Sequence, residues 1–103
     1  MMSDCSITST LGSCIDLEIV YQDDAGTPED ITDNTFDIYS ASRPALTNAV
    51  LTITDASVGK VHFHLAPEFS ANLANGNINW FRIRRTKPDG CVQVSEQIWI
   101  NIV

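Results

Sequence analysis

The sequence lacks the short motifs that carry catalysis in many enzymes. It has no G-x-S-x-G nucleophile elbow, no glycine-rich phosphate loop, and no cysteine with a histidine nearby in the chain. Without a nucleophile that has a neighbouring base, and without a phosphate-binding loop, the sequence indicates no particular reaction. We therefore expect a protein that is not an enzyme and that needs no cofactor or small-molecule substrate.

Cysteine and basic residues are also scarce. The three cysteines, Cys5, Cys14 and Cys91, are odd in number and include no C-x-x-C, so neither a disulfide framework nor a zinc knuckle is expected. We interpret them as buried free thiols. Six basic residues against 13 acidic ones give a formal net charge of -7. That charge repels phosphate and anionic lipid, which disfavours nucleic acid and membrane surfaces as partners.

Long apolar runs are missing as well. No run approaches the roughly 20 residues that cross a bilayer as a helix. The first residues, Met1-Met2-Ser3-Asp4, lack the basic and apolar regions of a signal peptide. We therefore expect synthesis in a cytoplasm, and 103 residues allow one domain with a modest core.

Period-two alternation of apolar and polar residues runs through most of the chain, whereas helical periodicity is nearly absent. The expected strands are 5–9, 14–22, 35–42, 49–54, 61–65, 78–86 and 91–102. One short helical turn is expected from Pro67 to Leu73. Short strands at regular spacing predict an all-β, antiparallel sandwich of about seven strands. Residues 1–13 are expected to be an N-terminal arm or a weak first strand, and residues 14–103 a single sandwich domain.

The last two predicted strands form a hairpin around Lys87-Pro88-Asp89-Gly90, and their alternation assigns the two faces. One inward face is expected from residues that share a parity: Val92, Val94, Ile98, Ile100 and Ile102. The alternation breaks near Ser95-Glu96, which we interpret as a bulge.

The outward face of the same hairpin is expected to carry Trp80, Arg82, Arg84 and Trp99. Tryptophan and arginine are enriched at interface hot spots, and exposed tryptophan rings are costly to leave in water. Two alternatives follow. These four residues form a protein–protein interface, or the helix or the N-terminal segment covers the tryptophans within the monomer. The basic cluster, which also includes Arg85, is expected to pair with carboxylates.

Two patterns suggest metal ligands without completing a site. His62 and His64 are two apart on one strand and point to the same side, but they need a third ligand, for which Asp55 is near only in sequence. The acidic run consists of Asp23, Asp24, Glu29, Asp30 and Asp33 and does not have the spacing of an EF-hand. We interpret the histidines as an exposed pair and the run as a solvated loop, and we predict no metal site.

The order of several short motifs resembles a family of small virion proteins of tailed bacteriophages. The similar segments are "LEIVYQDDAGTPEDIT" with its D-x-x-G-x-P turn, "ITDASVGKVHFHLAPEFSANLANG", and "WFRIRRTKPDG". A final strand completes the pattern, and the similarity covers residues 14–103. Such domains are Ig-like β-sandwiches in upper baseplate, tail and other accessory proteins, so the resemblance implies an Ig-like fold and no catalytic residues.

The resemblance also implies a role. It predicts a non-enzymatic structural subunit of a phage particle, which docks in the tail, baseplate or fibre-attachment apparatus after synthesis in the host cytoplasm. Its partners would be other phage structural proteins and copies of itself. One alternative is a capsid decoration protein. Another is a carbohydrate- or cell-surface-binding module, because Trp80 and Trp99 offer ring faces on which sugars stack.

Overall fold

The computed structural model describes residues 5–103, which fold into eight strands and three short helical segments. The strands are β1 (Cys5–Ser9), β2 (Ile15–Val20), β3 (Thr35–Ala41), β4 (Val50–Asp55), β5 (Lys60–Leu65), β6 (Gly76–Thr86), β7 (Val92–Val94) and β8 (Ile98–Ile102). The helical segments are two 3₁₀ turns, η1 (Pro44–Asn48) and η2 (Ala56–Val58), and one α-helical turn, α1 (Pro67–Ser70). None of them is long and apolar enough to cross a membrane.

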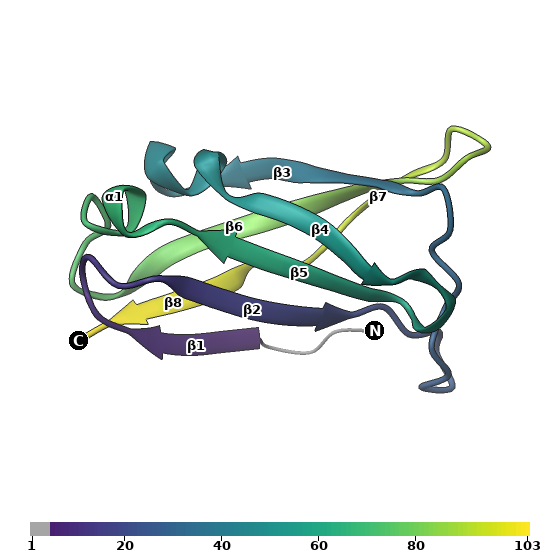
Figure 1. Cartoon of the computed structure of the whole chain (residues 1–103), viewed down its shortest axis with the longest axis horizontal. Helices are drawn as coiled ribbons and strands as arrows, with labels where there is room; N and C mark the ends of the chain where they lie inside the picture. Colours follow the sequence, from purple (N-terminus) through teal and green to yellow (C-terminus); the bar gives the residue numbers. More distant parts are fainter. Residues whose placement is uncertain (1–4) are drawn as a thin grey trace.

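The strands form two sheets. The larger has the order β1-β8-β6-β3, with β7 also paired to β6, and the smaller has the order β2-β5-β4. In Figure 1 the ribbons of β2, β4 and β5 lie in front of the fainter β6 and β8. All pairs are antiparallel except β1 with β8, which is parallel. The all-β fold expected from the alternation is confirmed, whereas the Ig-like assignment stays a prediction.

The core lies between the two sheets and is built by the inward residues of each alternating strand. On β5, Val61, Phe63 and Leu65 are fully buried. The Phe63 ring stacks on Phe81 of β6, with ring centroids 4.5 Å apart and planes 14° from parallel. Burying one such side chain contributes roughly 2 kcal/mol. Because side chains alternate along each strand, the residues buried in this core determine which residues lie on the two outer faces.

The last predicted strand is in fact two strands, which accounts for eight strands rather than about seven. Ile98, Ile100 and Ile102 are buried as expected, but Val92 and Val94 are 55% and 41% exposed, so their inward placement was wrong. Val94 of β7 pairs with Arg84, and Ile98 of β8 pairs with Phe81, so three residues between these pairs on one side lie opposite two on β6. The extra residue is a β-bulge, and it reverses which residues of the alternating pattern point inward.

Two further expectations need correction. Cys14 and Cys91 are exposed free thiols, not buried ones. Cys14 precedes β2 and Cys91 follows the Pro88-Asp89-Gly90 turn, so neither lies on an inward strand position. The helical turn begins at Pro67 as expected but ends at Ser70, three residues earlier than Leu73.

Gly59 is the glycine at which a side chain would do most damage. It has φ 71°, and a Cβ there would lie 2.6 Å from the Tyr21 carbonyl oxygen and 2.8 Å from that of Glu29. We expect Gly59→Ala to lower the free energy of unfolding by about 3 kcal/mol, from left-handed strain plus backbone collision. Gly26→Ala is the control, because Gly26 has φ 82° but open space around it. It should cost only about 1 kcal/mol of strain. Urea unfolding measures both variants. If both lost the same free energy of unfolding, the close approach of the Tyr21 and Glu29 carbonyl oxygens to Gly59 would be contradicted.

Candidate interaction surface

The outer face of the larger sheet brings together the four residues that the sequence singled out. Trp80 on β6 lies directly opposite Trp99 on β8, and both rings are partly exposed. Arg82 and Arg84 follow Trp80 on the same side of β6, since they alternate with buried residues. We call this surface the tryptophan face: Tyr39, Ile78, Trp80, Arg82, Arg84, Val92, Val94 and Trp99.

The two arginines of the tryptophan face have different surroundings. The Arg84 guanidinium makes a two-point ion pair with Asp37, with Nε 3.0 Å from Oδ1, and lies 5.9 Å from the centre of the Tyr39 ring. The hydrogen bonds that Arg84 donates to Asp37 raise the pKa of Arg84 above its already high ordinary value. Arg82 takes part in none of the ion pairs within residues 5–103. The face therefore presents one cation already neutralised and one that is not.

A shallow cavity lies beside Trp99, where the bulge separates β7 from β8. It has a volume of about 360 Å³ and is lined by Arg82, Val94, Ser95, Glu96, Gln97 and Trp99. Ser95 holds the bulge in place because its Oγ accepts a hydrogen bond from the Ile83 amide at 2.9 Å. The bulge thus provides both the exposed valines and a hollow next to an aromatic ring.

The alternative hypothesis was that the helix or the N-terminal segment covers the tryptophans, both of which are partly buried. β1 pairs alongside β8, with Ser6 opposite Trp99, so it widens the sheet instead of lying over it. The helical turn is tied to the start of β2, since the Ser70 Oγ donates to the Ser13 carbonyl at 2.7 Å. The part of the predicted N-terminal arm in residues 1–4 lies outside the described residues.

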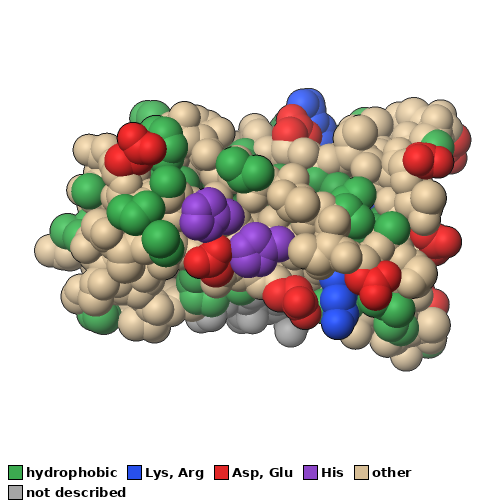
Figure 2. Space-filling model, viewed as in Figure 1, with side chains coloured by type: hydrophobic (Ala, Val, Ile, Leu, Met, Phe, Trp, Pro, Cys, Tyr) green, Lys and Arg blue, Asp and Glu red, His purple; other side chains and the backbone are tan. Residues whose placement is uncertain are grey.

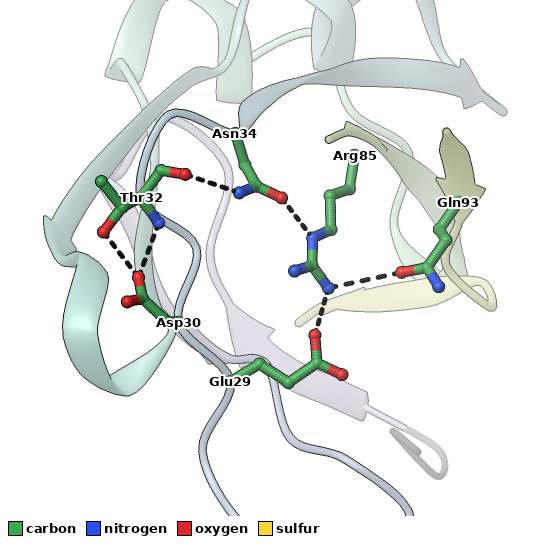
Figure 3. A network of polar contacts seen from close by, with 6 residues as sticks. All are labelled: Glu29, Asp30, Thr32, Asn34, Arg85 and Gln93. Carbon is green, nitrogen blue, oxygen red and sulfur yellow. Dashed lines mark hydrogen bonds and ion pairs between the residues drawn. The ribbon is translucent and has the colours of Figure 1, made fainter. Parts of the chain in front are cut away.

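Arg85 has a different position from its two neighbours in the basic cluster. It points inward and is 4% exposed. Its Nε donates to Asn34 at 2.7 Å, and its Nη1 contacts Glu29 and donates to Gln93 at 3.3 Å (Figure 3). Its guanidinium carbon lies 5.2 Å from the centre of the Tyr21 ring. The expected pairing with carboxylates holds for Arg85 and Arg84, but the burial of Arg85 was missed.

The same network accounts for much of the acidic run. Glu29 pairs with Arg85, Asp30 accepts from the Thr32 amide at 2.9 Å, and Asp23 accepts from the amides of Ala25 and Thr27. The hydrogen bonds from Thr32 hold the pKa of Asp30 below its usual range. Two surface depressions of about 660 and 650 Å³ flank Arg85. Asp23 and Asp30 thus hold turns within the loop, and Glu29 anchors it to Arg85 of β6.

The predicted histidine pair lies on the opposite side of the molecule, on the outer face of the smaller sheet. His62 and His64 point the same way, as expected. The carboxylate beside them is Asp16 of β2, which contacts both imidazoles at 2.8 Å, and not Asp55. Cross-strand pairing of β2 with β5 brings Asp16 there, 48 residues from His64.

No protein-family model matches the sequence, and no curated protein matches it. The resemblance of the motif order to phage virion proteins therefore stays a prediction.

The burial of Arg85 makes a prediction about stability. Arg85→Met keeps an unbranched side chain of similar length but leaves Glu29 and Asn34 without their hydrogen-bond donor. We expect the free energy of unfolding to fall by about 3 kcal/mol. This is the low end of the range for a broken buried ion pair, because Glu29 is 32% exposed. Arg84→Met, on the exposed face of the same strand, should cost far less. Urea unfolding of both variants checks this, and similar losses would show that the network does not hold the loop.

Tyr21 makes a prediction about alkaline pH. Burial, with a smaller contribution from Glu29, raises its pKa to about 12, although Arg85 acts in the opposite direction. The unfolded chain loses this proton near pH 10 and the native state does not, so native stability falls between about pH 10 and 12, by about 2 kcal/mol. Tyr21→Phe should remove that part of the decline. If the free energy of unfolding fell equally between about pH 10 and 12 in the wild type and in Tyr21→Phe, the raised pKa of Tyr21 would be refuted.

Proposed function

We propose that this protein is a non-enzymatic structural subunit that docks on its neighbours through the tryptophan face. The observation that carries the proposal is the cross-strand pair Trp80–Trp99 beside Arg82, which forms no ion pair within the described chain. Aromatic rings and arginine at the centre of a polar rim are the usual composition of an interface hot spot. Exposed Ile78 and Val92 extend the apolar surface around them.

The strand order supports an Ig-like domain. In immunoglobulin constant domains one sheet contains strands A, B, E and D and the other contains C, F and G. If β2 to β6 are lettered B to F and β7–β8 is strand G, the smaller sheet reads B-E-D and the larger G-F-C. β1 then lies beside strand G. This order agrees with the fold that the motif resemblance implies.

We place the subunit in a phage particle, in the tail, baseplate or fibre-attachment apparatus, with other structural proteins and copies of itself as partners. Support comes from the order of motifs over residues 14–103. A net charge of -7 suits docking on protein rather than on nucleic acid or membrane. A capsid decoration protein would use the same face, and a monomer in free solution would favour that role.

The cavity beside Trp99 favours a second candidate, a carbohydrate-binding module. Its walls combine one aromatic ring with the polar side chains of Arg82, Glu96 and Gln97. A sugar ring stacks its apolar face on an aromatic and hydrogen-bonds at its edge. Glycan-array binding that is lost in Trp99→Ser would support this function instead of docking.

The docking proposal predicts a defined oligomer by light scattering across a concentration range. We expect Trp80→Ser with Trp99→Ser, and separately Arg82→Glu, to lower the mass to that of a monomer, because each removes hot-spot contacts or reverses their charge. Val50→Ser is the control, since Val50 is 57% exposed on the smaller sheet.

The outcomes separate the alternatives. A closed oligomer that survives both tryptophan changes, with circular dichroism unchanged, would exclude the tryptophan face as the self-interface. A wild type that stays monomeric would exclude self-assembly and favour the decoration role.

A further inference from the structure

The outer face of the smaller sheet carries a compact group of three metal-ligating side chains. His62 and His64 flank the buried Phe63 on β5 and therefore both project outward. Asp16 is the register partner of His64 on β2. The side chains of Asp16, His62 and His64 are 49%, 38% and 40% exposed. Figure 2 shows the two histidines in purple, side by side near the middle of this face, with acidic side chains in red next to them.

The ligand atoms of the three residues already converge. Asp16 Oδ1 lies 2.8 Å from His62 Nε2 and 2.8 Å from His64 Nδ1. The two imidazole rings are 6.4 Å apart and within 18° of parallel. One ligand atom from each residue lies within 4.8 Å of the others. The group is thus close enough to share one ion.

We propose that Asp16, His62 and His64 bind a divalent transition-metal ion, with zinc as the representative ion. Imidazole and carboxylate ligands suit zinc, which takes three protein ligands and leaves a fourth position to water. At ligand distances of about 2.0–2.1 Å, two tetrahedral ligands lie about 3.3 Å apart. The aspartate oxygen and each ring nitrogen therefore have to separate by about 0.5 Å, which small rotations of exposed side chains allow.

The surroundings support the site. The three ligands stand on two hydrogen-bonded strands and not on loops, so the backbone spacing between them is fixed. Glu18 is paired with His62 on the same outer face, but it is not among the three residues whose ligand atoms converge. Lys60, at the start of β5, shares the outer side of the strand with His62 but is not part of the group of converging ligand atoms.

Calorimetric titration of the full chain with zinc chloride at about pH 7.5 tests the proposal. Cys14 and Cys91 are exposed thiols, and thiolates are zinc ligands in general, so the titration uses a parent in which all three cysteines are serine. We expect one ion per chain. Asp16→Asn and His64→Asn should each weaken binding about tenfold or more, because each removes one of three ligands.

Glu18→Gln is the matched control, because it removes a carboxylate from the same strand and face without removing a ligand. It should change the affinity by less than about threefold, as expected for a screened surface charge. Circular dichroism shows which variants keep the fold. No saturable heat at millimolar zinc, or equal affinity in the parent and the folded Asp16→Asn variant, would overturn the proposal.

Discussion

The stacked contact between Phe63 and Phe81 fixes which way the neighbouring residues of both sheets point. Both rings are fully buried, and they join the middle of β5 to the middle of β6. Because side chains alternate along a strand, an inward Phe63 turns His62 and His64 outward, and an inward Phe81 turns Trp80 and Arg82 outward. The two candidate sites thus lie on opposite outer faces because one core contact sets the parity of two strands.

Parity along a single strand was readable from the sequence, and pairing between distant strands was not. The outward histidines, the outward tryptophans and the inward isoleucines of β8 all followed from alternation. The position of Asp16 could not be predicted in this way, because no local pattern shows that β2 pairs with β5 in the register that places Asp16 opposite His64. The prediction that Val92 and Val94 point inward was wrong for a related reason. The break near Ser95 was visible, but whether it reverses the alternation depends on the partner strand.

The three arginines of the β6 cluster show how one residue type serves three purposes on a single strand. Arg82 forms no ion pair within the described chain, Arg84 is neutralised by Asp37, and Arg85 is buried against Glu29. Taken as a charge count, they form a basic patch. Taken by parity, Arg85 belongs with Phe81 and Ile83 in the interior, and that signal was present in the sequence. The surface that a partner meets is therefore much less positive than the composition of the hairpin implies.

The parallel pairing of β1 with β8 has a mechanical consequence. Cys5 lies opposite Ile98 and Ser9 opposite Ile102, so the chain enters β1 at one end of the ribbon and leaves β8 at the other. Tension applied at the start of β1 and at the end of β8 acts along both strands and loads the hydrogen bonds between them in shear, all at once. In an antiparallel hairpin pulled from its open end, the bonds would instead break one after another.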